Sequence, residues 1–313
     1  MKILVTGAGG FLGRGLVARL LGGALAFERL TLWDSHLPAW SGDGVRLLTG
    51  DLRDPAARDA AFEGGADLIF HLASVPSGRS EEQPALSRAV NLDAMLALLD
   101  AAAAEKRPPR VVFASSIAAL GRLGPAPVDD DTPPRPALTY GAHKLMGEVA
   151  LADMSRRGLL DGVSLRPAGI LARPPTPTGQ RSAFLSEVFH ALKAGRPFAA
   201  PVGEDATSWL ISRAACVEAF LAAAAIPANA MPPWRSFTLP ALRVRFGDLA
   251  AAAGAALGRD AAALVRFEPD EAVEANFGRY PPLTTRVADE LGLRSDGSLE
   301  AMIASVLGDL EPA

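Results

Sequence analysis

Short apolar runs alternate with helix-forming stretches through the first half of the chain, and this alternation constrains the fold more than any other feature. The apolar runs are Ile3–Thr6, Leu30–Trp33, Val45–Leu48, Leu68–Leu72, Val111–Ala114 and Val163–Leu165. The helical stretches are about Leu12–Leu21, Pro55–Phe62, Pro84–Lys106 and Tyr140–Arg157. Asp54-Pro55 is typical of an N-cap followed by proline at the first helical position. Strands that alternate with helices form βαβ units, so we expect an α/β fold with a doubly wound parallel sheet.

A glycine-rich turn, Gly7-Ala8-Gly9-Gly10-Phe11-Leu12-Gly13, follows the first apolar run and leads into the first helical stretch. Gly7, Gly10 and Gly13 are spaced so that a diphosphate can approach the backbone where a Cβ would obstruct it. The amide groups at the beginning of the helix would then bind the phosphates. Glycine also marks ordinary turns, but this position between a strand and a helix predicts a dinucleotide-binding turn of the Rossmann fold.

Two acidic residues extend this interpretation to the choice of cofactor. Asp34 ends the second apolar run, roughly 20 residues beyond the turn, where a carboxylate accepts both ribose hydroxyls of the adenosine. A carboxylate there repels a 2′-phosphate, so we expect NAD; Arg14, near the turn, would instead favour the phosphate of NADP. Asp51, after the third run, is placed to receive the adenine amino group or, alternatively, to cap a turn.

A tyrosine and a lysine, Tyr140 and Lys144, lie four residues apart and therefore on one face of the predicted helix. A nearby ammonium lowers the pKa of a phenol, so that the tyrosine can exchange a proton with a substrate alcohol. Ser115 and Ser116 close the fifth apolar run, at the edge where open α/β sheets bind ligands. We expect Ser116, rather than Ser115, to hold the substrate oxygen; a serine that binds local backbone groups is the alternative.

The second half of the chain is less regular, and the change falls near Arg173-Pro174-Pro175-Thr176-Pro177. The expected elements there are helices at about Ser182–Ala194, Arg213–Ala225, Phe246–Leu257 and Leu299–Leu307, and strands at Phe237–Leu239 and Leu264–Phe267. The predicted domains are a nucleotide-binding Rossmann domain of residues 1–172, with a return contribution from about 210–240, and a smaller C-terminal α/β substrate-binding domain of residues 173–209 and 241–313.

At these motifs the chain resembles the extended short-chain dehydrogenase/reductases, also called the NAD-dependent epimerase/dehydratase family. The matching segments are Thr6–Gly13, Gly50–Asp54, Phe70–Ala73, Asn91–Asp93, Ser115-Ser116 and the Tyr140/Lys144 pair. The resemblance implies an NAD-dependent dehydrogenase with a catalytic triad of Ser116, Tyr140 and Lys144, and with Asn91 supporting the central helix. The expected cofactor-binding residues are Gly7, Gly10, Phe11, Leu12, Gly13, Asp34, Asp51, Leu52, Ala73, Tyr140, Lys144 and Pro167.

The substrate class is inferred from segments that differ from those of nucleotide-sugar epimerases. Gly169 stands where those enzymes usually have an asparagine, and Ala119-Leu120-Gly121 replaces their Val-Tyr-Gly. Tyr140–Met146 and Trp209–Ser212 resemble instead a bacterial branch of sugar-acid enzymes, the D-erythronate dehydrogenases. That branch implies oxidation of the C2 hydroxyl of a four-carbon sugar acid to the 2-keto acid. Thr207-Ser208 stands where that branch is expected to have an arginine, which leaves the identity of the acid open.

Positioned polar groups would bind the carboxylate and hydroxyls of such an acid. The candidates are Ser74, Ser77, Gly78, Ser116, Tyr140, His143, Arg173, Arg181, Ser182 and Trp209. Each has a structural alternative: Arg181 as a solvated loop charge, Trp209 as a core residue, His143 as an exposed helix residue. Two other functions stay open, namely an NAD-dependent nucleotide-sugar epimerase/dehydratase and a non-catalytic cofactor-sensing protein, which would have no need of the Tyr140/Lys144 pair.

Charge and composition bear on partners and location. The net charge of -4 gives no basic excess for a nucleic acid, and the single cysteine, Cys216, fits a reducing compartment. The four histidines have no metal-ligand spacing, so no metal is expected. The apolar stretches are too short to span a membrane and no targeting segment is visible, so we expect a cytoplasmic protein. The family resemblance implies a homodimer through the helices at Pro84–Lys106 and Tyr140–Arg157; packing of their Leu/Ala faces inside the monomer is the alternative.

Overall fold

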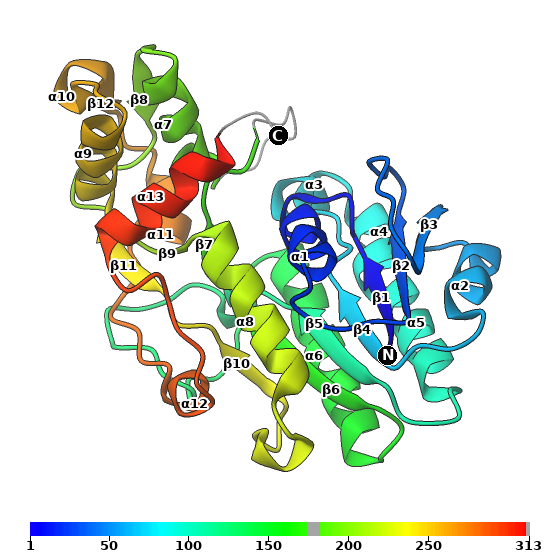
Figure 1. Ribbon diagram of the computed structural model, residues 1–313. Helices are drawn as coiled ribbons and strands as arrows, with labels where there is room; N and C mark the ends of the chain where they lie inside the picture. The colour runs from blue at the N-terminus through cyan, green and yellow to red at the C-terminus, as the bar shows by residue number, and fades with distance from the viewer. Residues whose placement is uncertain (175–181, 311–313) are drawn as a thin grey trace. The chain divides into compact units, whose positions relative to one another are not determined.

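A computed structural model describes residues 1–174 and 182–310, and the chain divides into two compact units (Figure 1). The first unit comprises Met1–Ala119, Pro136–Arg166 and Val217–Phe237, and the second comprises Leu120–Arg135, Pro167–Cys216 and the chain from Thr238 onward. The segment Leu120–Arg135 thus belongs with the second unit, whereas the sequence analysis expects all of residues 1–172 in one domain. The nucleotide-binding and substrate-binding roles of the two parts stay predictions.

One sheet of seven strands, in the order β10-β6-β5-β4-β1-β2-β3, forms the centre of the described first unit. Its strands are β1 (Lys2–Thr6), β2 (Arg29–Asp34), β3 (Val45–Thr49), β4 (Leu68–His71), β5 (Arg110–Ala114), β6 (Asp161–Arg166) and β10 (Ser236–Thr238). Strands β1 to β6 pair in parallel throughout. The strand order reverses between β1 and β4. The predicted fold class, a doubly wound parallel sheet of the Rossmann type, is confirmed.

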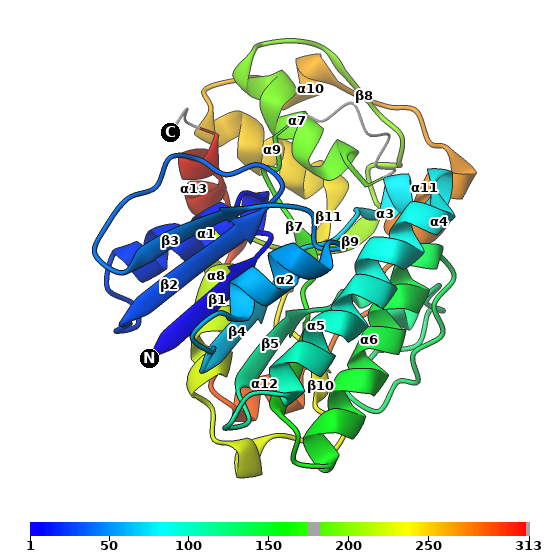
Figure 2. The ribbon, with the colours of Figure 1, turned by 90° about the vertical axis from the view of Figure 1, so that its right-hand side faces the viewer.

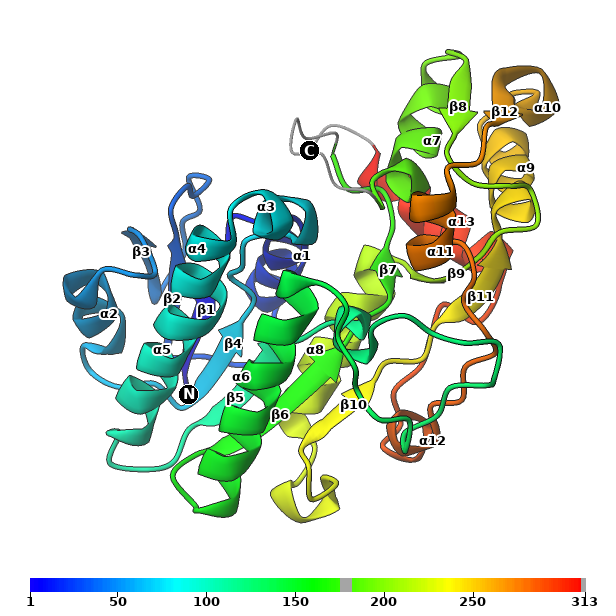
Figure 3. The ribbon, with the colours of Figure 1, turned by 180° about the vertical axis from the view of Figure 1, so that it is seen from behind.

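Helices cover both faces of this sheet. They are α1 (Phe11–Leu21), α2 (Pro55–Phe62), α3 (Ser77–Glu82), α4 (Pro84–Ser87), α5 (Ala94–Ala103), α6 (Thr139–Arg156) and α8 (Arg213–Ala225), whose residues from Val217 belong to this unit. Helices α1 and α8 lie on the face toward the viewer in Figure 1, and α5 and α6 lie on the opposite face, seen in Figures 2 and 3. As the sequence predicts, Asp54 caps α2 by accepting from the Ala56 amide at 2.9 Å.

The sequence predicts one helix over the stretch Pro84–Lys106, but the structure shows that this stretch is not one regular α-helix. A π-helical turn, Arg88–Asp93, separates α4 from α5. The turn contains buried Asn91, whose side-chain oxygen accepts from the Val75 amide at 2.7 Å and whose nitrogen donates to the Val75 carbonyl at 2.9 Å. A π turn accommodates one extra residue within a helix. Here it aims an amide side chain at the loop after β4, an arrangement that helical periodicity does not reveal.

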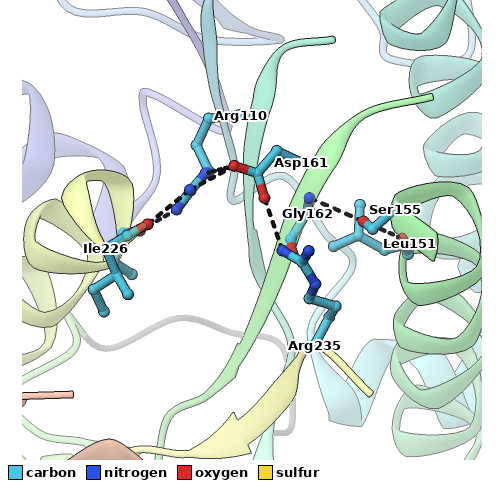
Figure 4. A network of polar contacts seen from close by, with 8 residues as sticks. Arg110, Leu151, Ser155, Asp161, Gly162, Ile226 and Arg235 are labelled. Carbon is cyan, nitrogen blue, oxygen red and sulfur yellow. Dashed lines mark hydrogen bonds and ion pairs between the residues drawn. The ribbon is translucent and has the colours of Figure 1, made fainter. Parts of the chain in front are cut away.

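The segment that returns to the first unit is held by a polar network at the beginning of β5 and β6 (Figure 4). Asp161 accepts from Arg110 at 2.5 Å and from Arg235 at 2.7 Å. Arg110 also donates to the Ala223 and Ile226 carbonyls, near the end of α8, at 2.8 and 2.7 Å. The Arg235 carbonyl accepts from the Ser164 amide of β6 at 2.7 Å. These bonds attach β10 and α8 to the sheet.

The second unit combines two small sheets with helices. The sheets have the orders β11-β9-β7 and β12-β8. The strands are β7 (Gly169–Ile170), β8 (Phe198–Ala200), β9 (Thr207–Ile211), β11 (Leu242–Arg245) and β12 (Val265–Phe267); the helices are α7 (Phe184–Lys193), α9 (Phe246–Ala256), α10 (Ala261–Leu264), α11 (Glu271–Phe277), α12 (Arg286–Glu290) and α13 (Leu299–Asp309). Phe189, Leu249 and Val306 join α7, α9 and α13 in one apolar core. No helix within residues 1–174 and 182–310 has the length and apolar character to cross a membrane.

Candidate active site

In the glycine-rich turn after β1, nearby backbone atoms leave no room for a Cβ at Gly7 and Gly13. Gly7 has a φ of +73°, and a Cβ on it would lie 2.5 Å from the Ala73 amide nitrogen, beyond β4. A Cβ on Gly13 would lie 2.1 Å from the Gly7 carbonyl oxygen. Helix α1 begins at Phe11, directly behind the turn, so its first amide groups lie beside bare backbone. This arrangement fits a dinucleotide diphosphate, which needs close backbone approach and helix N-terminal amides.

Gly9, which the sequence does not single out, is as constrained as Gly7 and Gly13. A Cβ on Gly9 would lie 2.0 Å from the His36 carbonyl oxygen, whereas the nearest atom to a Cβ on Gly10 would be 3.3 Å away. The Gly9 amide donates to the carboxylate of Asp34 at 3.0 Å. The turn after β1 therefore positions Asp34 at the end of β2, where the sequence predicts an acceptor for the adenosine ribose.

The other charged groups near this edge are engaged locally. Asp51 pairs with Arg53 at 2.6 Å, and the hydrogen bond from Arg53 lowers the pKa of the Asp51 carboxyl. Arg14, considered as a phosphate ligand of NADP, donates to the Gly9 carbonyl at 2.9 Å. Leu52 is buried and Ala73 is partly buried beside the turn. Their roles toward a cofactor stay predictions.

Tyr140 and Lys144 lie on the first two turns of α6, as their spacing predicts. Tyr140 is partly exposed, whereas Lys144 is buried and donates from Nζ to the Ala114 carbonyl at 2.7 Å. The lysine Nζ lies 5.4 Å from the centre of the Tyr140 ring and 4.8 Å from that of Phe113. Both the ammonium and the positive end of the α6 dipole favour the phenolate form of Tyr140. The pair is therefore arranged for proton transfer at a phenol oxygen.

Burial governs the charge of the groups around Lys144. Burial lowers the pKa of Lys144 to about 7, although the negative charge of Glu148 raises it. Burial, with a smaller effect from Lys144, lowers the pKa of His71 to about 3, so this histidine is neutral near pH 7. Its Nδ1 shares a hydrogen bond of 2.7 Å with the Thr6 hydroxyl. His71 thus adds no positive charge beside the lysine.

The two serines after β5 have different partners. Ser115 is buried and donates a short hydrogen bond to the Glu148 carboxylate. Ser116 is partly exposed, and its hydroxyl oxygen accepts from the Ala118 amide at 3.1 Å, a bond that uses a lone pair and not the hydroxyl hydrogen. This difference favours Ser116, the residue chosen from the sequence, as the serine that meets a substrate.

The candidate substrate residues of the first unit fall into two groups. Ser74, Ser77 and Gly78 are partly exposed after β4, with Ser77 and Gly78 in the first turn of α3. His143 is instead buried on α6, shares a hydrogen bond of 2.9 Å with Ser87, and has its pKa lowered by burial. Its position supports a packing role, and it is not the exposed helix residue considered as its alternative.

The candidates of the second unit are also differently placed. Arg173 is exposed, Ser182 is partly buried just before α7, and Pro167 directly follows β6; Arg181 lies outside the described residues. Trp209 is fully buried in β9, donates its indole N–H to the Pro281 carbonyl at 2.7 Å and packs on Tyr280. This position supports the structural alternative for Trp209, a core residue.

A buried ion pair beside the catalytic helix escapes the sequence analysis. Glu148 receives Arg166 through Nε at 2.9 Å and Nη2 at 2.6 Å, in addition to the Ser115 hydroxyl. The available signal was the acid four residues beyond Lys144, on the same helix face. Among the residues that the structure describes, no group of three His, Cys, Asp or Glu side chains is arranged to hold a metal ion.

Comparisons with known proteins agree with this geometry. The model of the "NAD dependent epimerase/dehydratase family" matches residues 3–230. The D-erythronate dehydrogenase of Cupriavidus necator is 36% identical over 99% of this chain and 98% of its own, and that of Haemophilus influenzae is 29% identical over 97% and 98%. A solved structure described as a nucleoside-diphosphate-sugar epimerase from Agrobacterium tumefaciens matches with a TM-score of 0.88 and 32% identity, covering 97% of this chain and 92% of that one.

Proposed function

Because the chain belongs to the NAD dependent epimerase/dehydratase family, we propose that it oxidises the C2 hydroxyl of a small sugar acid, such as D-erythronate, to the 2-keto acid, with NAD as its cofactor. The observation that carries the proposal is the buried Lys144 beside Tyr140 at the edge of the sheet that also holds the glycine-rich turn. The family and the enzyme class predicted from the sequence, an NAD-dependent dehydrogenase of the extended short-chain type, are confirmed.

The residues that would hold NAD lie after β1, at the end of β2 and on α6. The bare backbone of the turn, with Gly7 and Gly13, would receive the diphosphate, and Asp34 would accept the ribose hydroxyls. Lys144 would hold the nicotinamide ribose. When bound, NAD accepts the hydride that leaves the substrate carbon.

Residues after β5 and on α6 would transfer the proton of the substrate hydroxyl. Ser116 donates a hydrogen bond to the substrate oxygen and orients it toward the phenol. Tyr140, as the phenolate, takes the hydroxyl proton, and the carbonyl forms as the hydride leaves. Lys144 stabilises the phenolate through its positive charge, at 5.4 Å from the ring centre. Ser74 and Ser77, after β4, are candidates to hold the carboxylate of the acid.

A nucleotide-sugar epimerase is the second candidate, because the Agrobacterium structure with that description superposes closely on this chain. Such an enzyme shares the tyrosine and lysine but returns the hydride to the sugar. Incubation of the purified protein with NAD and either D-erythronate or UDP-sugars separates the two. We expect NADH to accumulate in proportion to the acid consumed; interconversion of UDP-sugars without net NADH would overturn the proposal.

A variant tests the role of the phenol in the same assay. Tyr140→Phe removes the proton acceptor and is expected to lower kcat by about 10²–10⁴-fold. NAD affinity, measured by calorimetry, and the circular dichroism spectrum should change little. Tyr280→Phe removes the other phenol of the chain and serves as the control. Unchanged kcat in Tyr140→Phe would contradict the mechanism.

Partners and location complete the proposal. We expect a homodimer in the cytoplasm with a small-molecule sugar acid as its substrate, and neither a nucleic acid nor a membrane as partner. The exposed apolar residues of α6, Met146 and Val149, support the dimer.

A further inference from the structure

Helix α6 carries a second buried charge one turn beyond its lysine. Glu148 is 2% exposed, as is Lys144. Four hydrogen bonds reach its two oxygens: a short one from the Ser115 hydroxyl after β5, two from Nε of Arg166 at the end of β6, and one from Nη2 of the same arginine. An isolated carboxyl at this depth would bind a proton, because burial disfavours its anion. A bidentate guanidinium and a hydroxyl donor stabilise the anion instead.

Lys144 needs such a partner because its own surroundings oppose its charge. Its Nζ has a carbonyl acceptor, Ala114, and two aromatic rings, but burial still lowers its pKa to about 7. The negative charge of Glu148 raises that pKa. The value of about 7 includes this effect of Glu148, so without the acid a larger fraction of Lys144 would be uncharged near neutral pH.

The other titratable groups packed around α6 do not stabilise the positive charge of Lys144. His71 of β4 faces Lys144 but is neutral, because burial lowers its pKa to about 3. Arg88 and Asp93 of the π turn, and Glu81 of α3, act on His143. Arg166 is itself a cation, so it cannot stabilise the charge of Lys144, and its guanidinium is paired with Glu148.

We propose that Glu148 is a positioning residue that keeps Lys144 an ammonium in the working enzyme, and that Arg166 and Ser115 serve to hold Glu148 ionised. The inference rests on the proposed function for its kinetic consequence. The phenolate of Tyr140 depends on the ammonium. As pH increases, kcat/KM therefore rises when Tyr140 loses its proton, and the high-pH limb of the profile falls when Lys144 loses its proton. Loss of Glu148 moves that falling limb to lower pH.

The charge of the lysine can be read directly, without substrate. The chain has four lysines, Lys2, Lys106, Lys144 and Lys193, so protein labelled with ¹³C-lysine gives few ε-CH₂ signals, and Lys144→Met assigns the one of interest. In Glu148→Gln we expect the midpoint of the Lys144 titration to fall by about one pH unit or more. Asp153→Asn, which removes an exposed acid of the same helix, should leave it unchanged. An unchanged midpoint in folded Glu148→Gln would overturn the inference.

Loss of the acid leaves a buried guanidinium unpaired, so a second variant guards against misfolding. Glu148→Gln/Arg166→Gln removes both charges, and Lys144 is again expected to titrate below the wild-type midpoint, by less than in the single variant. Glu148→Asp keeps the charge and should stay near the wild type. If Lys144 titrated in the folded double variant with the midpoint of the wild type, the role assigned to Glu148 would be refuted.

The pH profile separates this inference from the proposed function. With D-erythronate and NAD, the high-pH limb of kcat/KM in Glu148→Gln should follow the lysine midpoint downward. A lowered lysine midpoint in a protein that oxidises no sugar acid would refute the proposed function and support the role of Glu148. Oxidation of the acid with an unmoved limb and an unmoved lysine would refute that role alone.

Discussion

Gly9 joins two loops at the scale of a single residue. Its amide donates to Asp34 at 3.0 Å, and a Cβ in its place would stand 2.0 Å from the His36 carbonyl oxygen and 3.3 Å from the Asp34 carboxyl carbon. Backbone atoms cannot move aside as the end of a flexible side chain can. The missing side chain therefore lets the turn after β1 approach the loop after β2 and hold Asp34.

We predict that Gly9→Ala separates these loops. The free energy of unfolding, measured with urea, should fall by about 1–3 kcal/mol, the usual cost of overpacking, and NAD should bind more weakly. Gly308→Ala is the control: this glycine lies in α13 with open space where a Cβ would go, so alanine should stabilise the chain by about 0.5–1 kcal/mol. Equal unfolding of Gly9→Ala and the wild type would contradict the steric argument.

At the scale of elements, the network around Asp161 connects β5, β6, β10 and the end of α8 (Figure 4). The side chains of Arg110, Asp161 and Arg235 keep only 13%, 27% and 18% of their exposure. Arg235 has a φ of +55°, which is uncommon for a residue with a side chain, and its hydrogen bonds with Asp161, Gly162 and Ser164 of β6 hold it there. One carboxylate thus fixes two cations from segments far apart in the sequence.

Asp161→Asn should leave both guanidinium groups without their counter-charge. We expect the free energy of unfolding to fall by about 2 kcal/mol, less than for a fully buried pair because the three side chains keep part of their hydration. The matched control is Asp153→Asn, since Asp153 also faces two arginines, Arg156 and Arg157, but on the exposed side of α6. Equal urea midpoints for the two variants would show that the network adds no stability.

At the scale of the whole molecule, α6 presents apolar side chains to its surface. Met146 is 50% exposed and Val149 is 62% exposed, while Lys144, Glu148 and Leu151 of the same helix are buried. Exposed apolar groups gathered on one helix face favour contact with another protein surface. The homodimer implied by the family resemblance would cover these residues.

Sedimentation velocity over a range of concentrations tests that assembly. We expect a dimer for the wild type, and for Val149→Glu a dissociation constant raised about tenfold or more, because a charge would be buried in the interface. Leu47→Glu, at an exposed position of β3, should leave the dissociation constant unchanged. A monomer at all concentrations of the wild type would refute the expectation of a dimer.

Much of the fold follows from local pattern, and much of the candidate site from local spacing. The alternation of apolar runs predicts β1 to β6, and Asp54-Pro55 predicts the beginning of α2. The second unit was predicted less completely: β7, β8, β9 and β11 were not expected, because short strands within irregular sequence have too few residues to show a period of two.

The sequence by itself determined the doubly wound sheet, the glycine-rich turn and the tyrosine and lysine on one helix face, because each depends on residues close together in the chain. Only the tertiary structure decided which serine is engaged by Glu148, that Arg166 pairs with this acid, and that Trp209 belongs to a core. Ser115 and Arg166 lie 33 and 18 residues from Glu148. Such pairs meet only when parallel strands and their helix pack together, and no local periodicity encodes that contact.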